Sequence, residues 1–377
     1  MRFEFATAGR IIFGPGTIAE LGPLARGIGR RAFVVTGRDK IRLASTINGL
    51  EGAGLGCTLF GVAGEPTVSL VREGASLLRT VGCELLIAIG GGSVIDAGKA
   101  IAALAANSGD VLDYLEVIGK ARPLTNAPFP MIAVPTTAGT GSEVTRNAVL
   151  GSPEHRVKAS LRSPMMLPRV AIVDPQMTLG LPPAITASTG LDALTQLIEP
   201  YVGLRANPVT DALCLDGLRA VKGSLAKACE DGNDAAARAG MSYASLLGGL
   251  ALANAGLGVV HGFAAPIGGM FEAPHGAVCA AILPYGMEVN IRKRDALERY
   301  REIARLLTGD PDAIPEDGAQ WVRQLVESLR IPRLSAYGIG AEHVDDIVAK
   351  AARSASMKAN PVELTPAELK WVLESAL

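Results

Sequence analysis

Aromatic residues are scarce in this sequence of 377 residues: they make up only 4%, although hydrophobic residues as a whole make up 49%. A core with so few rings must be built mainly from Ala, Val, Ile and Leu. These side chains suit close helix–helix and helix–sheet packing better than a β-sandwich. The length is sufficient for two domains, each with a full core.

The chain has no block of like charge, and its 36 basic and 37 acidic residues nearly balance, to a formal net charge of −1. Nucleic acids and anionic membranes attract strongly basic surfaces. Neither is therefore expected as a partner, and a small molecule is favoured instead.

The cysteines are odd in number and widely spaced, and none belongs to a C-x-x-C pair. They are Cys57, Cys83, Cys214, Cys229 and Cys279. This spacing argues against a disulfide framework or a thiolate zinc site and favours reduced cysteines in the core. The sequence also lacks a charge-free apolar run of about 18 residues and a signal-peptide pattern at its start. We therefore expect a soluble, cytoplasmic protein.

Short apolar runs alternate with helix-like stretches in the first half of the chain. The runs that end at glycine, proline or aspartate and have the pattern of buried strands are 32–36, 85–89, 131–134 and 170–173. Helical patterns such as 68–81 and 95–106 lie between them. This alternation predicts a parallel sheet covered by helices on both faces. Ligands of such sheets bind beyond the carboxyl ends of the strands.

The pattern changes near residue 180. Pro182 and Pro183 are typical of a helix start, and long segments with a 3.6-residue period follow without a convincing strand. These segments are 186–201, 208–229, 235–256, 296–307, 317–328 and 365–376. The sequence therefore predicts an α/β domain over 1–180 and an all-helical domain over 181–377.

Two turns rich in glycine and hydroxyl residues directly follow strand-like runs. The first is Gly90-Gly91-Gly92-Ser93, and the second lies within 134–145, which reads VPTTAGTGSEVT. Small residues let backbone N–H groups and short hydroxyls approach phosphates that larger side chains would hold away. The two turns together predict a nucleotide cofactor.

Histidine occurs only four times, and His261 and His275 flank one glycine-rich helical segment. Asp192 and Gln196 are four residues apart, so they share one face of a helix. A carboxylate, an amide and two imidazoles on inner helix faces would suit one Zn²⁺ or Fe²⁺ ion, with a position open for substrate. The spacing alone also fits hydrogen-bonded core histidines and an aspartate placed for the helix dipole.

The chain resembles the iron-containing (group III) alcohol dehydrogenase family over nearly its full length. The matching segments are 9–16, the glycine turn with 96–100, 135–143, 190–194, 275–276 and 360–361. The resemblance implies a dinucleotide-binding α/β domain over 1–180 and a helical domain over 181–377 that binds metal and substrate, in the architecture shared with dehydroquinate synthase. It also implies a cleft between the domains and a homodimer.

By the same resemblance, Asp192, His261 and His275 match metal ligands and would serve catalysis. Gln196 stands where most members have a histidine ligand, and Ala265 where they have another histidine near the substrate. Related glycerol-type dehydrogenases and dehydroquinate synthase use one carboxylate and two histidines, so such a site remains workable with Zn²⁺ or Fe²⁺. The alternative is a degenerate site without metal.

The family's cofactor contacts also carry over by position. The matching residues are Gly91, Gly92 and Ser93 at the pyrophosphate, Asp96 one turn further on, Thr136 and Thr137 near the nicotinamide, and Lys158 at the nicotinamide ribose. For Lys158, a solvated surface position is the alternative. Arg146 and His155 near the second turn are candidates for contact with an acidic substrate, although a surface role is favoured for both.

The choice between NAD(H) and NADP(H) depends on the end of the strand at 32–36. Family members that prefer NAD carry an aspartate there, which repels a 2′-phosphate. Gly37 takes its place here, and Arg38 and Lys40 add positive charge. We therefore expect NADP(H) to be accepted, while Asp39 keeps NAD(H) possible.

The predicted reaction is NAD(P)-linked hydride transfer between a small alcohol and its aldehyde or ketone at a divalent metal. The rival functions are reduction of an oxo-diacid, as by maleylacetate reductase, and a lyase reaction resembling that of dehydroquinate synthase. A nucleotide-binding protein without catalysis is the third.

Overall fold

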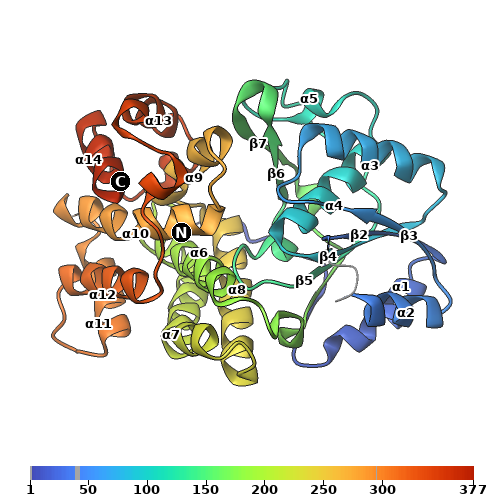
Figure 1. The fold of residues 1–377 in the computed structure, drawn as a ribbon, viewed down its shortest axis with the longest axis horizontal. Helices are drawn as coiled ribbons and strands as arrows, with labels where there is room; N and C mark the ends of the chain where they lie inside the picture. Colours follow the sequence, from blue (N-terminus) through green and yellow to red (C-terminus); the bar gives the residue numbers. More distant parts are fainter. Residues whose placement is uncertain (1, 39–42, 294) are drawn as a thin grey trace. The chain divides into compact units, whose positions relative to one another are not determined.

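The computed structural model describes residues 2–38, 43–293 and 295–377. The chain divides into two compact units (Figure 1). The α/β unit comprises Ala6–Thr137 and Gly141–Thr178, and the helical unit comprises Leu179–Leu377 with residues 2–5 and 138–140. Residues 138–140 thus pack with the helical unit although their neighbours in sequence belong to the α/β unit. This packing requires Gly139, because a Cβ there would lie 2.8 Å from Cβ of Thr189.

The α/β unit is built on a six-stranded sheet in which every pairing is parallel, as predicted. The strands, in their order across the sheet, are β1 (Ile11–Phe13), β8 (Val170–Val173), β5 (Met131–Pro135), β4 (Leu85–Gly90), β2 (Arg31–Thr36) and β3 (Gly56–Gly61). The sequence patterns indicated the four central strands but not β1 and β3. These two lie at the edges. Strand β1 has only three residues, all apolar but too few for a strand pattern, and β3 is largely exposed and lacks a continuous apolar run.

Helices cover both faces of this sheet, α3 and α4 on one and α1 and α2 on the other (Figure 1). Their bounds are α1 (Leu21–Arg26), α2 (Ala44–Gly52), α3 (Val68–Thr80) and α4 (Gly92–Ala106), and a short α5 (Val111–Tyr114) follows. Successive side chains of β2 point to opposite faces of the sheet and therefore belong alternately to the two cores. Phe33 and Val35 belong to the cluster of α3 and α4, whereas Ala32 and Val34 belong to that of α1 and α2.

An antiparallel hairpin, β6 (Asn147–Ser152) and β7 (Val157–Arg162), lies in the chain between β5 and β8. The sequence patterns did not indicate it. Its signal is a two-residue alternation in which Ala148, Leu150 and Leu161 point into the core, as expected for strands buried on one face only.

The helical unit has no strand among its described residues, as predicted. Its helices are α6 (Pro183–Val202), α7 (Pro208–Glu230), α8 (Ala235–Ala255), α9 (Val259–Met270), α10 (His275–Arg292), α11 (Leu297–Thr308), α12 (Pro315–Ser328), α13 (Val344–Ala351) and α14 (Pro366–Ala376). The glycine-rich segment before His275 is divided between α8 and α9. Gly256, with φ of 83°, ends the first of these helices.

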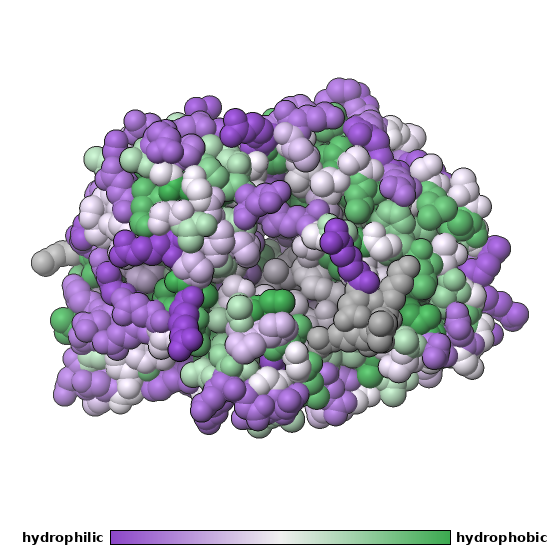
Figure 2. All heavy atoms as spheres, viewed as in Figure 1, coloured by the Kyte–Doolittle hydropathy of each residue, from purple (hydrophilic) through white to green (hydrophobic). Residues whose placement is uncertain are grey.

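Within the described residues, no single helix is both long and apolar enough to cross a bilayer. The α8–α9 pair meets that test only when taken together, with a bend of 97° between its helices. On the face shown in Figure 2, hydrophobic and hydrophilic residues are interspersed.

Candidate metal and cofactor sites

Close packing of helix α6 buries the first two predicted metal ligands. Gly190 lies against α7, where a Cβ would come within 2.3 Å of Cδ1 of Leu225. Asp192 and Gln196 follow on this buried helix, and their exposed fractions are 1% and 3%. A carboxylate this deeply buried requires a partner that compensates its charge.

The first turn of α9 holds His261 in a fixed orientation. One oxygen of the Glu199 carboxylate accepts from the Val260 N–H at 2.6 Å, and the other lies 2.7 Å from Nδ1 of His261. Gly258 makes room for this contact, since a Cβ there would lie 3.0 Å from Oε1 of Glu199. A carboxylate only accepts hydrogen bonds, so Nδ1 carries a proton, and Nε2 is the nitrogen that would bind a metal once its own proton is released.

His275 is brought to the same place by the close approach of α10 to α6. A Cβ on Gly276 would lie 2.3 Å from the carbonyl oxygen of Ser188 and 3.4 Å from Cβ of Asp192. Nε2 of His275 consequently lies 3.7 Å from Oδ1 of Asp192. Only glycine after the histidine permits this packing.

These residues converge with Cys279 into one group, which we call the Asp192 cluster: Asp192, His261, His275 and Cys279. One potential ligand atom from each lies within 4.8 Å of all the others. Nε2 of His261 is 3.4 Å from Oδ1 of Asp192, and Sγ of Cys279 is 3.7 Å from Nε2 of His275. Ligand atoms around a tetrahedral zinc ion are separated by roughly 3.3–3.8 Å, given its usual bond lengths.

Cys279 is not among the predicted ligands, because the spacing of the cysteines favours reduced thiols in the core. The available signal was its spacing, because it follows His275 by four residues on α10 and so shares its helix face. The described cysteines are free thiols, as predicted.

Three polar atoms at this place are buried without a hydrogen-bond partner among the described residues: Oδ1 of Asp192, Nε2 of His261 and Oε1 of Gln196. An unsatisfied buried polar atom costs about 1–3 kcal/mol, and more if it is charged. All three are electron-pair donors, and a divalent cation would satisfy such donors. The residues present therefore fit a metal ion.

The protonation states of the cluster depend on one another. Burial opposes charge on His261, but Cys279 and Asp192 raise the pKa of its imidazole well above the ordinary value. Burial likewise opposes charge on Cys279, yet His275 and His261 lower the pKa of the thiol. A cation would take the place of the protons held here, so metal binding should release protons.

In the α/β unit, the two glycine-rich turns lie side by side. Residues Gly90 and Pro135 pair at the ends of β4 and β5, and the Thr136 N–H donates to the Gly90 carbonyl at 3.0 Å. A Cβ on Gly91 would lie 3.3 Å from Oγ1 of Thr137. The turns thus meet at the carboxyl edge of the sheet, where a parallel sheet binds its ligands.

The same edge includes the start of α4 and the end of β2. Gly91 caps α4, and Gly92 and Ser93 form its first turn, so peptide N–H groups and the positive end of the helix dipole lie there. Gly37 follows β2, the neighbour of β4, and nothing lies within 4 Å of a Cβ built on it. Thr36, which the sequence analysis did not single out, has a buried hydroxyl without a partner among the described residues.

Asp96 and Lys158 already have partners within the α/β unit. Asp96 accepts hydrogen bonds from the Ser142 hydroxyl and, at 3.0 Å, from the Val149 N–H. Lys158 forms an ion pair of 2.6 Å with Glu65, and its side chain is only 8% exposed, so it is not a solvated surface lysine. The cofactor contacts of both residues stay predictions.

The remaining candidates lie apart from these groups or outside the described residues. His155 is exposed and contacts the Ser152 hydroxyl at 2.8 Å. Ala265 lies one turn after His261 on α9. Arg38 is exposed. Asp39 and Lys40 lie outside the described residues.

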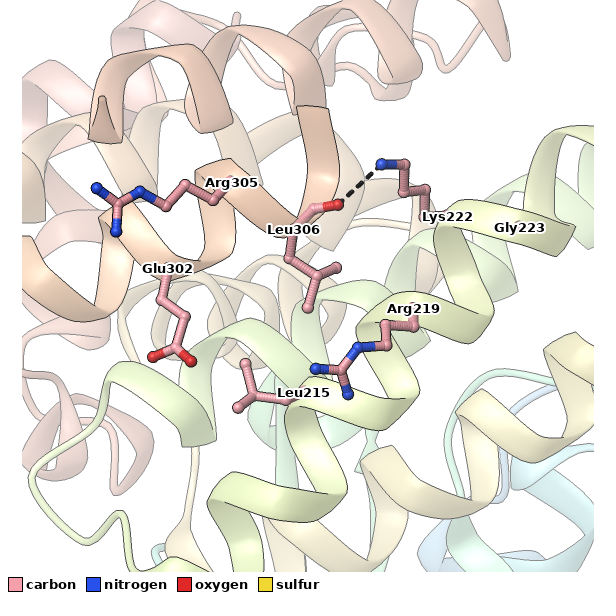
Figure 3. Close-up of a pocket in the computed structure, with 7 residues that line it drawn as sticks. All are labelled: Leu215, Arg219, Lys222, Gly223, Glu302, Arg305 and Leu306. Carbon is pink, nitrogen blue, oxygen red and sulfur yellow. Dashed lines mark hydrogen bonds between the residues drawn. The ribbon is translucent and has the colours of Figure 1, made fainter. Parts of the chain in front are cut away.

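A groove between α7 and α11 is a separate feature (Figure 3). Leu215, Arg219, Lys222, Gly223, Glu302, Arg305 and Leu306 line it. Nζ of Lys222 donates to the Leu306 carbonyl at 3.0 Å. It contains none of the residues predicted to bind cofactor or metal, so it is not the candidate active site.

The α/β unit has a parallel sheet with two glycine turns at its carboxyl edge, and the helical unit has a carboxylate–imidazole cluster. These two features together are typical of nucleotide-linked metal enzymes. Residues 8–175 match the family described as iron-containing alcohol dehydrogenase, and 186–377 match its C-terminal family. The chain therefore belongs to the iron-containing alcohol dehydrogenase family, as the sequence motifs indicated.

Individual relatives span nearly the whole chain. It is 36% identical over 370 residues to alcohol dehydrogenase 4 of Saccharomyces cerevisiae (strain YJM789), covering 97% of this chain and 96% of the yeast protein. A solved 1,3-propanediol oxidoreductase matches with a TM-score of 0.92 at 33% identity over the full length of both chains. Sulfoacetaldehyde reductase from Bifidobacterium kashiwanohense, solved with NAD⁺, matches with a TM-score of 0.88 at 29% identity, over 100% of this chain and 99% of that one.

The protein is thus a metal-dependent, NAD(P)-linked oxidoreductase that interconverts an alcohol and its carbonyl compound by hydride transfer.

Proposed function

We propose that Asp192, His261 and His275 hold the catalytic divalent cation, Zn²⁺ or Fe²⁺, with the Gln196 amide oxygen as a further, weaker ligand. The observation that carries this proposal is the set of buried, unpartnered donor atoms on Asp192, His261 and Gln196. Helices α6, α9 and α10 each contribute a potential ligand atom, and these atoms lie within 4.8 Å of one another. A purely structural role would not require this convergence.

When bound, the cation supplies Lewis acidity that polarises the substrate oxygen, and the nicotinamide supplies or accepts hydride. The chain's own residues orient the ligands. Glu199 fixes the ring of His261. Asp192 and His261 are buried, whereas the side chain of His275 is 36% exposed and is the ligand nearest to solvent. Ala265 cannot carry a proton, so this position supplies no relay for the alcohol proton.

For the cofactor, the α4 N-terminus and the turn after β5 supply the binding groups. The proposed contacts are Gly91, Gly92 and Ser93 at the pyrophosphate with Asp96 behind them, Thr136 and Thr137 nearer the nicotinamide, and Lys158 at the ribose. This assignment is supported by the contact between the two glycine-rich turns and by Gly91, which has no side chain to keep a phosphate from the backbone N–H groups.

NADP(H) should be accepted, because residue 37 is a glycine, which itself supplies no carboxylate and leaves open space after β2. Gly37→Asp tests this. The new carboxylate would repel a 2′-phosphate, so kcat/KM with NADPH should fall at least roughly tenfold, or about 1.4 kcal/mol, while kcat/KM with NADH is kept. Equal losses with both cofactors would contradict the assignment.

The metal proposal is tested by metal analysis of the purified protein, followed by assays with a panel of aldehydes, alcohols and oxo-acids. NADPH and NADH are each tried with added Zn²⁺, Fe²⁺ or neither. Asp192→Ala and His261→Ala should lose both metal and turnover. Turnover of maleylacetate in place of simple aldehydes would favour the oxo-diacid reductase, and turnover in chelator-treated protein would refute the metal site.

We further expect a cytoplasmic homodimer that acts on a small alcohol or aldehyde and binds neither nucleic acid nor membrane. Light scattering coupled to size-exclusion chromatography measures the assembly, and cell fractionation measures the location.

A further inference from the structure

We infer that the Cys279 thiolate is the fourth protein ligand of the metal, so that the ion is held by one carboxylate, two imidazoles and one sulfur. This inference rests on the proposed function of the Asp192 cluster. It replaces the weak Gln196 amide oxygen named above: sulfur, and not this neutral glutamine, takes the ligand position that family resemblance would give to residue 196.

The position of Cys279 on its helix is the first argument. His275 opens α10 and Cys279 follows four residues later, so both side chains project from one helix face. Gly276 lies between them and holds this end of α10 against α6. The face that presents the imidazole to Asp192 therefore presents the sulfur as well.

Distances give the second argument. Sγ of Cys279 lies 3.7 Å from Nε2 of His275 and within 4.8 Å of the other ligand atoms of the cluster. This spacing suits neighbouring ligands of one ion, with metal–sulfur bonds of about 2.3 Å and metal–nitrogen bonds of about 2.0–2.1 Å. Oδ1 of Asp192 and Nε2 of His261 have no hydrogen-bond partner among the described residues, which independently supports a cation at this place.

Charge is the third argument. Asp192, His261 and Cys279 are all buried, and an uncompensated buried charge is costly. A divalent cation with one carboxylate and two neutral imidazoles keeps a net positive charge. A thiolate offsets that charge directly at the ion, which the Gln196 amide cannot do; the Glu199 carboxylate, which contacts Nδ1 of His261, lies one imidazole further away. Some catalytic zinc sites expand from four to five ligands, so a fourth protein ligand still leaves room for substrate.

Cobalt(II) provides the test, because thiolate coordination gives an intense near-ultraviolet charge-transfer band that oxygen and nitrogen ligands lack. Metal is removed from the full-length protein with a chelator and Co²⁺ is added. The wild type should show the band. Cys279→Ser should bind Co²⁺ without it, and at least roughly 10–100-fold more weakly, the usual cost of losing even an indirect partner.

Matched variants separate the alternatives. Gln196→Ala and Cys214→Ser, the latter removing another fully buried thiol of the helical unit, should both keep the band. Bound cobalt without the band in the wild type, or a band that persists in Cys279→Ser, overturns the inference but leaves the metal site intact. Failure of the wild type to bind cobalt overturns the proposed metal site as well.

A second measurement does not depend on the folding of any variant. X-ray absorption of the wild type loaded with Zn²⁺ should show one sulfur at about 2.3 Å. A first shell of only nitrogen and oxygen would overturn the assignment of Cys279.

Discussion

Glu199 and His261 form a buried pair in which the carboxylate fixes the imidazole that faces the Asp192 cluster. Oε2 of Glu199 lies 2.7 Å from Nδ1 of His261, and Oε1 accepts from the N–H of Val260 in the same helical turn. Ligating histidines commonly donate their second nitrogen to such a carboxylate, which fixes both the ring orientation and the tautomer. We therefore expect Glu199 to be a positioning residue for the proposed ligand His261.

Glu199→Gln tests that role. With its amide oxygen facing Val260, the new side chain would turn an NH₂ group toward Nδ1 of His261. The proton would then favour Nε2, the nitrogen that must be free for metal. We expect metal affinity to fall roughly 10–100-fold, as measured by competition with a chelator. Glu302→Gln, which replaces the acceptor of the Tyr201 hydroxyl elsewhere in the helical unit, should leave metal affinity unchanged. Equal affinity in both variants would contradict the role.

The central fold was predictable because local pattern and burial agree there. Strands β2, β4, β5 and β8 are continuous apolar runs, as strands covered on both faces must be. Edge strand β1 and the hairpin β6–β7 lack such runs, because one is short and the other is buried on one side only. The hairpin sequence alternates between buried and partly exposed residues, but this two-residue pattern is a weak signal.

The candidate site was only partly predictable, because the proposed ligands come from three helices, and the direction in which each helix presents its side chains depends on tertiary packing. Asp192, His261 and His275 followed from family position, and their convergence required Gly190, Gly258 and Gly276 to let helices and side chains approach. The sequence spacing of the cysteines to one another does not indicate Cys279. Its spacing to a histidine was the informative one.

Lys99 should be a major stabilising residue of the α/β unit. It is fully buried, forms an ion pair of 3.2 Å with Asp96, and donates to the Ser142 carbonyl at 2.9 Å and the Asn147 carbonyl at 2.5 Å. Lys99→Met would leave the Asp96 carboxylate without its cation. Breaking a buried pair from one side costs about 3–5 kcal/mol of unfolding free energy, measurable by urea denaturation.

The double variant Asp96→Asn/Lys99→Met provides the control for that measurement. Removing both charges should cost less than the sum of the two single substitutions, because the uncompensated charge is gone. Strict additivity would show that the pair is not coupled.

Glu143 should make stability fall as pH rises. Burial raises the pKa of its carboxyl to about 7 from an ordinary value of 4.5, against opposing effects of its own backbone N–H and Lys99. Between these values the folded state binds a proton that the unfolded chain has released, and unfolding free energy then declines with pH. The contribution is fully present below the unfolded pKa and lost by about pH 7.

Glu143→Gln cannot ionise, so its urea-denaturation midpoints should decline less steeply across this pH range than those of the wild type. Glu154→Gln, at an exposed position of the same unit, should follow the wild-type profile. Parallel profiles for wild type and Glu143→Gln would show that this carboxyl does not govern the decline.

Gly276→Ala should separate His275 from Asp192. The added Cβ would lie 2.3 Å from the carbonyl oxygen of Ser188, and because that atom is backbone, the start of α10 must move away from α6. Overpacking of this kind costs about 1–3 kcal/mol, and cobalt affinity should fall as well. Gly223→Ala, where nothing lies within 4 Å of the new Cβ, should instead gain about 0.4–1 kcal/mol and bind cobalt normally. If Gly276→Ala bound cobalt as tightly as Gly223→Ala, the approach of α10 to α6 would not be what assembles the site.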